Sequence, residues 1–209
     1  MALSSKTKAV LLGPLNKNNP VIVQVLGICS ALAVTSKLEP SLVMAIAVTI
    51  VTAFSNLIIS MLRKTIPTRI RIIVQLVVVA ALVTIVSEVL KAFAYDVNKQ
   101  LSVFVGLIVT NCILMGRLEA FALGNGPIPS FLDGIGNGLG YGFILIIVGF
   151  LRELFGSGTL GGIKVIPQAF YDAGYENNGL MMLAPMALII IGAVIWVHRS
   201  RNKDLQEEN

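Results

Sequence analysis

The sequence predicts an all-α integral membrane protein with six membrane segments. Of the 209 residues, 56% are hydrophobic and only 13% are charged, which is far from the composition of a soluble globular domain. A helix needs about 20 apolar residues to cross about 30 Å of hydrocarbon. Six runs of the chain contain no Asp, Glu, Lys or Arg and are the candidate segments: Pro20 to Ser36, Pro40 to Leu62, Ile72 to Ser87, Gln100 to Gly116, Gly134 to Leu151 and Asn177 to Val197.

The first and fourth segments are shorter than the others. Their apolar stretches extend from Val21 to Val34 and from Leu101 to Met115, roughly 21 to 23 Å of helix at about 1.5 Å per residue. Backbone groups left unpaired at membrane depth are tolerated only where protein or a cavity covers them. We therefore expect segments 1 and 4 to be half-helices in the protein interior, with Cys29 and Cys112 near the midplane.

The order short, long, long occurs twice along the chain. The division falls near Asn98, and an odd number of crossings in each half requires the second half to be inverted relative to the first. We predict one membrane domain over residues 1–209, made of inverted repeats at approximately 18–98 and 99–200. A two-fold axis in the membrane plane would bring Cys29 and Cys112 together near the centre.

Lysine and arginine predict the orientation. One side of a six-segment protein would hold Lys6, Lys8, Lys17, Arg63, Lys64, Arg69, Arg71, Arg117, Arg199, Arg201 and Lys203. The opposite side would hold only Lys37, Lys91, Lys99, Arg152 and Lys164. The positive-inside bias then places both termini in the cytoplasm. Topology accounts for the net charge of +5, and no nucleic-acid partner is predicted.

Cys29 and Cys112 are the only cysteines, and they are candidate metal ligands because thiolates are soft donors. Iron–sulfur clusters and tetrahedral metals normally take four protein donors. The single histidine, His198, lies at the wrong depth at the end of segment 6, so the missing ligands would come from another subunit. Inert packing of two small apolar side chains and a disulfide are the alternatives. We expect Gly27 and Gly106 to ease close packing around the thiols.

Acidic residues near the membrane are candidates for an ion pathway. Glu88 closes the apolar run of segment 3, and Asp133 lies where segment 5 begins. Interfacial solvation or helix capping would also explain both. Arg152 and Glu153 are adjacent in sequence and do not face one another on a helix, so we expect them to mark the membrane boundary.

Two glycine patterns resemble nucleotide-binding loops. Alternating glycines occupy Gly134 to Gly142, and Gly156 to Gly161 satisfies Gly-x-Gly-x-x-Gly. Neither pattern follows a strand of a βαβ unit, so no NAD or flavin site is predicted. The first set is better explained by close approach of membrane helices, and the second by a loop outside the membrane.

Longer motifs surround the cysteines. They are Asn18 to Pro20, Gln24 to Cys29, Leu32 to Thr35, Ser102 to Cys112, Gly116-Arg117, Glu119 to Ala122, Pro127 to Gly134 and Gly149 to Leu154. In these stretches the chain resembles the D subunits of the Na⁺-translocating NADH:quinone oxidoreductases. The resemblance covers nearly the whole chain.

The resemblance implies a subunit of a six-subunit complex of the bacterial inner membrane that oxidises NADH, reduces ubiquinone and exports Na⁺. It also implies a sister, the E subunit, with the same fold and the opposite orientation. In that family each sister contributes two cysteines to an iron centre, taken as a [2Fe-2S] cluster, and these cysteines map onto Cys29 and Cys112. The chain would relay electrons and would not be catalytic alone.

Three alternatives stay open at this point. The chain also resembles, less closely, the E subunit of the Rnf ferredoxin:NAD complex, although the Asn-Pro opening and the Pro-Ile-Pro-Ser-Phe stretch favour the quinone-reducing complex. A secondary transporter would equally have inverted repeats with broken helices, but it would leave two midplane cysteines without a role. A structural scaffold for neighbouring redox subunits is the third.

Overall fold

The computed structural model describes residues 10–11, 13–15, 18–67, 69–93, 106–160, 163–164 and 179–202. The described α-helices are α2 (Ile28–Val34), α3 (Leu38–Leu62), α4 (Arg71–Phe93), α6 (Cys112–Arg117), α7 (Pro127–Ser157) and α9 (Ala184–Arg201). Shorter elements are η1 (Gly13–Leu15), the π-helical turn η2 (Leu118–Ala122), η3 (Gly179–Met182) and the strands β1 (Thr159–Leu160) and β2 (Ile163–Lys164). Within the described residues the fold is therefore helical except for one small antiparallel strand pair.

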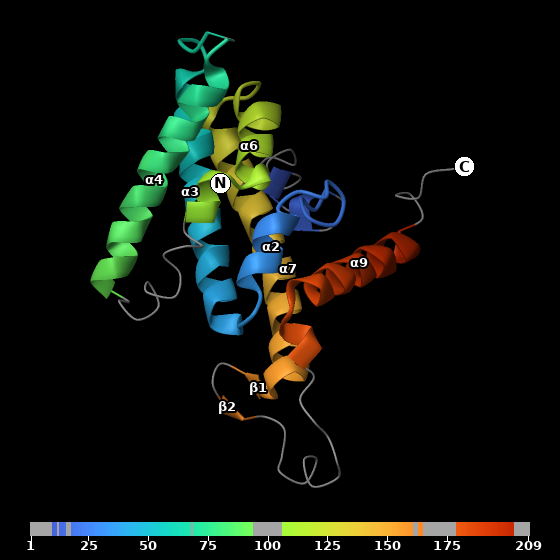
Figure 1. Cartoon of the computed structure of the whole chain (residues 1–209). Helices are drawn as coiled ribbons and strands as arrows, with labels where there is room; N and C mark the ends of the chain where they lie inside the picture. Colours follow the sequence, from blue (N-terminus) through green and yellow to red (C-terminus); the bar gives the residue numbers. More distant parts are fainter. Residues whose placement is uncertain are drawn as a thin grey trace, which may run out of the picture.

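The helices α3 and α7 form the centre of the molecule and run antiparallel (Figure 1). Glycines spaced four residues apart on α7 let the two backbones touch. A Cβ atom on Gly134 would lie 2.6 Å from the Cα atom of Ala53, and one on Gly138 would lie 2.6 Å from the Cα atom of Thr49. Helix packing in membranes depends on such close approach. The prediction that these glycines serve helix packing is confirmed.

The alternate glycines of the same run face a different neighbour. A Cβ atom on Gly136 would lie 2.8 Å from the carbonyl oxygen of Leu11, and one on Gly140 would lie 2.6 Å from that of Pro14. The two sets of glycines thus place α3 on one side of α7 and the N-terminal segment on the other.

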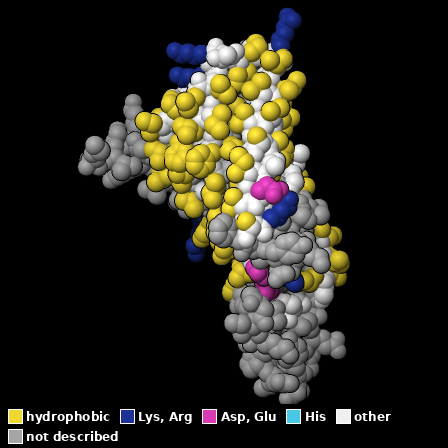
Figure 2. All heavy atoms as spheres, turned by 90° about the vertical axis from the view of Figure 1, so that its left-hand side faces the viewer, with side chains coloured by type: hydrophobic (Ala, Val, Ile, Leu, Met, Phe, Trp, Pro, Cys, Tyr) yellow, Lys and Arg dark blue, Asp and Glu magenta, His cyan; other side chains and the backbone are white. Residues whose placement is uncertain are grey.

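Among the described residues, four helices are long and apolar enough to cross a membrane: α3, α4, α7 and α9. More than half of the central span is buried in α3 and α7, compared with only 17% in α4 and in α9. In Figure 1, α4 contacts the bundle along α3, and α9 leaves the bundle at an angle. Figure 2 faces the α4 side and shows hydrophobic side chains over most of the described surface. The chain is a multi-pass membrane protein.

Segment 1 is less helical than predicted. The helix α2 begins only at Ile28, and residues 20–27 lie outside any helix. The Asn19 side-chain oxygen accepts hydrogen bonds from the backbone N–H groups of Val21 (3.0 Å) and Ile22 (3.1 Å), as an N-capping residue does. Val25 (φ 57°) and Gly27 (φ 78°) then adopt the left-handed conformation, which interrupts a right-handed helix. The expectation of a half-helix over 21–34 holds only for its second half.

Segment 4 is interrupted at its cysteine. Residues 106–109 are helical, the helix breaks at Thr110 and Asn111, and α6 starts at Cys112. The Asn111 side chain accepts a hydrogen bond from the backbone N–H of Ile113 at 3.2 Å, which caps the new helix. The first residues of the predicted segment, 101–105, lie outside the described residues.

The end of α7 differs from the expected loop. Gly156 and Ser157 belong to the helix, and Gly158 ends it in the left-handed conformation with a φ of 68°, a common helix C-terminus for a residue without Cβ. The strand β1 follows directly, and Gly161 lies outside the described residues.

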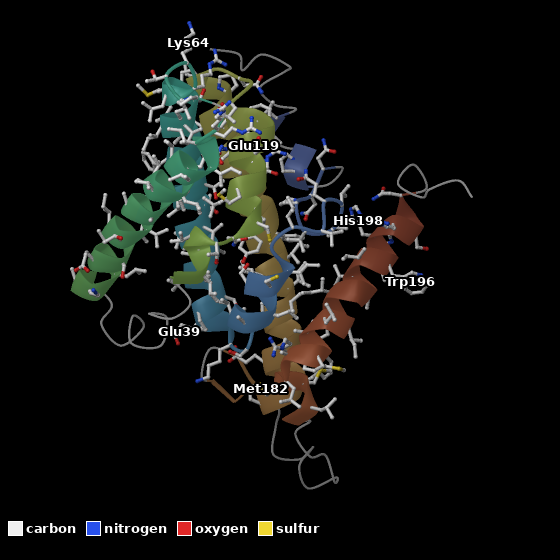
Figure 3. All side chains as sticks on the ribbon, turned by 45° about the horizontal axis from the view of Figure 1, so that its top comes forward. Glu39, Lys64, Glu119, Met182, Trp196 and His198 are labelled. Atoms are coloured by element: carbon white, nitrogen blue, oxygen red, sulfur yellow. The ribbon has the colours of Figure 1, made fainter. Side chains whose placement is uncertain are left out.

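The inverted repeat stays a prediction. The helices α3 and α7 are the second segments of the two predicted halves and run in opposite directions, but the division near residue 98 lies outside the described residues. Figure 3 shows Lys64 at one end of the bundle and Glu39 and Met182 toward the other. Which end faces the cytoplasm also stays a prediction.

Candidate intramembrane metal site

The two cysteines occupy the starts of two short helices. Cys112 is the first residue of α6 and Cys29 is the second residue of α2. The backbone N–H of Gly27 donates a hydrogen bond to Cys112 Sγ at 3.3 Å, so this sulfur lies beside the N-terminus of α2. Both thiols are free, so Cys29 and Cys112 do not form a disulfide in this structure. Cys29 is exposed and Cys112 is partly buried.

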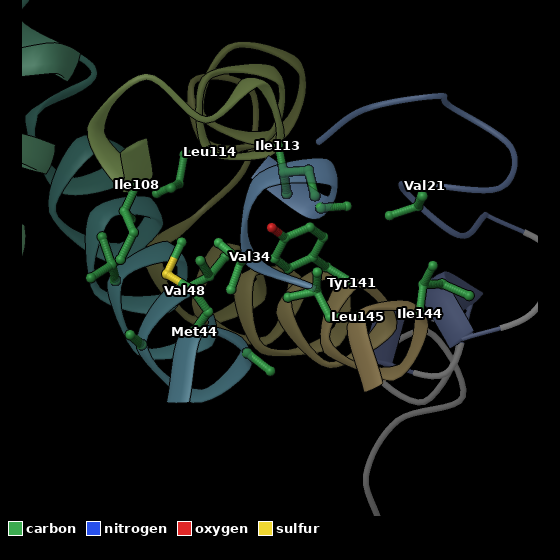
Figure 4. Packing of buried hydrophobic residues seen from close by; sticks show 14 of the residues in the cluster. Val21, Val34, Met44, Val48, Ile108, Ile113, Leu114, Tyr141, Ile144 and Leu145 are labelled. Atoms are coloured by element: carbon green, nitrogen blue, oxygen red, sulfur yellow. The ribbon is translucent and has the colours of Figure 1, made fainter. Parts of the chain in front are cut away.

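Buried polar side chains join the two helix starts to α7. Ser30 Oγ lies 2.7 Å from Tyr141 Oη and 3.2 Å from Asn111 Nδ2. Tyr141 lies near the middle of the 31-residue α7, and Figure 4 shows its ring between α2 and α7, close to Ile113. The cysteine-bearing ends are therefore level with the middle of the longest membrane helix.

Gly27 is required at its position for two reasons. Its φ of 78° lies in the left-handed region, and a Cβ atom there would approach Ile113 Cδ1 to 2.6 Å, so an L side chain would be both strained and crowded. The expectation for Gly27 is confirmed. The expectation for Gly106 is wrong, because a Cβ atom on Gly106 would meet nothing within 4 Å.

The ligand set within this chain is small. Among the described residues, no three His, Cys, Asp or Glu side chains gather closely enough to hold a metal ion. His198 lies toward the C-terminal end of α9 (Figure 3) and contacts the side-chain amide of Asn202 at 3.3 Å. Cys29 and Cys112 are thus the thiol donors that the described chain could offer to a metal.

Asp133 forms the most buried ion pair among the described residues. Its carboxylate accepts two hydrogen bonds from Arg117, at 2.6 Å and 2.9 Å, and a third from Asn137 Nδ2 at 3.0 Å. It lies in the second turn of α7 and is almost fully buried, so it neither caps the helix nor is solvated at an interface. The pair borders a cavity of about 240 Å³ that Asn18 and Gln24 also line.

Glu88 is placed differently. Its side chain is exposed near the C-terminal end of α4 and forms an ion pair with Lys91 at 2.7 Å, as interfacial solvation would give. The helices α4 and α7 both run downward in Figure 1, so Glu88 and Asp133 lie toward opposite ends of the molecule. The structure does not bring the two acidic candidates together.

Arg152 and Glu153 are both buried, and both bind other parts of the chain. Arg152 donates hydrogen bonds to Leu32 O (3.3 Å) and Thr35 Oγ1 (2.7 Å) at the end of α2. It also donates to backbone carbonyls of η3 and of the residue that follows, namely Met181, Met182 and Leu183. A cation at a helix C-terminus is electrostatically favourable. That Arg152 and Glu153 lie at the membrane boundary stays a prediction.

Glu153 acts on the next helix. Its Oε2 accepts a hydrogen bond from the backbone N–H of Leu38 at 2.6 Å, at the N-terminus of α3, where negative charge is favourable. Two adjacent residues of α7 therefore bind the C-terminal end of α2 and the N-terminal end of α3, on either side of the turn between these helices. The only sequence signal for this role is a pair of opposite charges directly after a long apolar run.

Fold and site together define a class: a multi-pass membrane protein in which two interrupted segments place the helix starts that carry Cys29 and Cys112 level with the middle of α7. Within that class, the chain belongs to the family described as "Rnf-Nqr subunit, membrane protein", which matches residues 7–195.

Curated relatives agree with this assignment. The chain is 60% identical, over 100% of both chains, to the D subunit of the Na(+)-translocating NADH-quinone reductase of Proteus mirabilis. It is 62% identical to the protein of that name from Photorhabdus laumondii, over 94% of each chain, and 60% identical to that of Serratia proteamaculans, over 96% of each chain. The resemblance drawn from the sequence motifs is confirmed, and these relatives are named as subunits of an enzyme complex.

Proposed function

We propose that this chain is the D subunit of a Na⁺-translocating NADH:quinone reductase in the bacterial inner membrane. In this proposal Cys29 and Cys112 are two thiolate ligands of an iron–sulfur centre of the [2Fe-2S] type. The sister E subunit supplies the other two ligands, and the chain serves electron transfer coupled to Na⁺ export. The observation that supports this most directly is the 3.3 Å contact between Gly27 N and Cys112 Sγ, because it joins one thiol to the start of the helix that carries the other.

The donor set fits such a centre. Two thiols make half of a four-cysteine set, and the exposure of Cys29 leaves that thiol accessible to ligands from a neighbouring subunit. The Gly27 N–H directed at Cys112 Sγ is the kind of hydrogen bond that tunes a cluster's potential. When bound, the cluster supplies a one-electron carrier at membrane depth. The chain itself supplies two ligands at the starts of two short helices, which the Gly27–Cys112 hydrogen bond joins.

Replacing either cysteine tests this proposal. The Cys29→Ala and Cys112→Ala variants, purified as whole complexes, should lose the iron of this centre and its electron paramagnetic resonance signal. Quinone reduction should fall by about a hundredfold, since the loss of a ligand breaks the relay. Val25→Ala is the matched control, because Val25 is an exposed apolar residue four positions before Cys29. If iron content and quinone reduction are unchanged in both cysteine variants, the two thiols are not ligands of the centre. The function is then that of a scaffold or a transporter.

We propose further that Asp133 and Glu88 lie on the cation pathway and that both termini are cytoplasmic. The buried Asp133 beside a partly polar cavity supports the first statement for Asp133. Several Lys and Arg side chains at the top of the molecule in Figure 2 support the second. Because Arg117 already neutralises Asp133, a passing cation would have to compete with that arginine.

Asp133→Asn removes the carboxylate for which Arg117 and a passing cation would compete. The variant should raise the Na⁺ concentration needed for half-maximal quinone reduction by about tenfold or more, because an intramembrane charge is lost. Glu119→Gln is the control, since Glu119 is a partly exposed carboxylate paired with Arg71. Initial rates measured across a Na⁺ series separate the two variants. An unchanged Na⁺ dependence in Asp133→Asn removes Asp133 from the pathway.

A further inference from the structure

Two polar side chains adjacent to the cysteines hydrogen-bond each other. Ser30 directly follows Cys29 and Asn111 directly precedes Cys112, and Asn111 Nδ2 donates to Ser30 Oγ at 3.2 Å. Ser30 and Asn111 are 5% and 3% exposed, respectively. A bond between α2 and the start of α6 thus lies one residue away from each thiol.

This bond is part of a closed ring. Ser30 Oγ donates to the carbonyl oxygen of Gly27 at 2.9 Å, and the N–H of the same glycine donates to Cys112 Sγ at 3.3 Å. The peptide bond between Asn111 and Cys112 completes the ring. Movement of one helix start relative to the other would stretch several hydrogen bonds at once, and in a buried site each lost bond leaves an unsatisfied group.

Tyr141 connects the ring to α7 through a hydrogen bond with Ser30. A serine hydroxyl has one proton to donate and two lone pairs with which to accept. Ser30 gives its proton to Gly27 O and accepts one hydrogen bond from Asn111, so the Tyr141 hydroxyl, 2.7 Å away, must be the donor in the third contact. The hydroxyl of Ser30 is then fully used, and the Tyr141 side chain is 0% exposed.

We propose that Ser30, Asn111 and Tyr141 are positioning residues that fix the two thiols relative to each other and to the closely packed α3–α7 pair. The proposal rests on the proposed function, because it concerns the two proposed ligands of the metal centre. The network would set the spacing of these ligands without touching the metal. Hydrogen bonds behind the ligands of a metal orient those ligands and tune the metal's properties.

The test uses Tyr141→Phe and Ser30→Ala in the complete purified complex. Both variants should keep the iron of the centre but shift its reduction potential and broaden or shift its resonance lines. The double variant should shift the potential no further than Ser30→Ala alone, because both changes act on the same hydroxyl. Ser130→Ala is the control, since Ser130 is a buried serine of α7 whose hydroxyl donates to Gly126 O at 2.8 Å, at the start of its own helix. A potential and spectrum unchanged in both Tyr141→Phe and Ser30→Ala overturn the proposal.

A second measurement does not depend on iron. Deuterium exchange of peptides covering residues 24–36 and 106–118 should be several-fold faster in Tyr141→Phe than in the unaltered complex, and unchanged in Ser130→Ala. If the unaltered complex holds no iron, the proposed function fails, and the exchange rates alone decide whether the network positions the two helix starts. Equal exchange in Tyr141→Phe and the unaltered complex overturns the positioning role.

Discussion

Replacing Arg152 with methionine should remove the subunit from the assembled complex or lower the complex's thermal stability sharply. Methionine keeps much of the side-chain length but none of the donors that reach the end of α2 and the carbonyls of η3. Hydrogen bonds to a charged group contribute about 1.5 to 3 kcal/mol each, and several of their acceptors would lose their partner. We expect a destabilisation of more than about 3 kcal/mol.

Two variants make the Arg152 experiment specific. Arg71→Met removes another arginine of the same chain, but one that is 41% exposed and paired at the surface with Glu119, so it should cost at most about 1 kcal/mol. Arg152→Lys keeps the charge and should restore part of the stability. The measurements are the amount of this subunit in the purified complex and the denaturation temperature. Equal behaviour of Arg152→Met and Arg71→Met would show that the buried network contributes nothing.

Replacing Gly138 with leucine should prevent α3 and α7 from packing. The added Cβ atom would lie 2.6 Å from the Cα atom of Thr49, and a backbone atom cannot turn aside as a flexible side chain can. Overpacking ordinarily costs about 1 to 3 kcal/mol. The cost here should exceed that range, because the two central helices must separate along their shared face. The complex should lack this subunit altogether.

Gly192→Leu is the matched control for Gly138→Leu. Gly192 is also a glycine of a membrane helix, α9, but a Cβ atom there would meet nothing within 4 Å. Quantifying the subunit in membranes and in the purified complex compares the two changes. Normal assembly of Gly138→Leu, or equal loss in both variants, would mean that the close contact between α3 and α7 is not needed.

The long membrane segments could be predicted from the sequence because apolar length is a local property. Runs without charge find the central parts of α3, α4, α7 and α9, although α7 extends beyond its run at both ends and α9 begins only at Ala184. The shortness of the first and fourth segments predicts that Cys29 and Cys112 belong to broken helices. The glycines of α7 could also be interpreted, since a spacing of four residues returns to nearly the same face of a helix. Each of these signals lies within a single stretch of chain.

The remaining features depend on contacts between distant stretches. Adjacent residues such as Arg152 and Glu153 give no sign that they reach the ends of α2 and α3, more than a hundred positions away. The role of Tyr141 likewise depends on its meeting Ser30, which belongs to another segment.

The late start of α2 could not be predicted for a related reason. Nothing in an apolar run from residue 21 to residue 34 shows that the backbone of Val25 takes a positive φ of 57°, which interrupts the helix. The Asn19 side-chain amide donates to the carbonyl oxygen of Gly140 at 3.2 Å, so α7 fixes the turn that precedes α2. Hydropathy measures apolar length and carries no information about such a backbone conformation.

The exposure of α4 and α9 has a consequence for how the subunit is held in the bilayer. Lipid tails are as apolar as leucine, so little drives a membrane helix onto its neighbours except close packing, and only 17% of the span in α4 and in α9 is buried within this chain. Within this chain, α4 and α9 are therefore held by less packing than the central pair of α3 and α7. We expect the angles of α4 and α9 to be set by the surrounding lipid and neighbouring chains, while the glycine-packed centre keeps its shape.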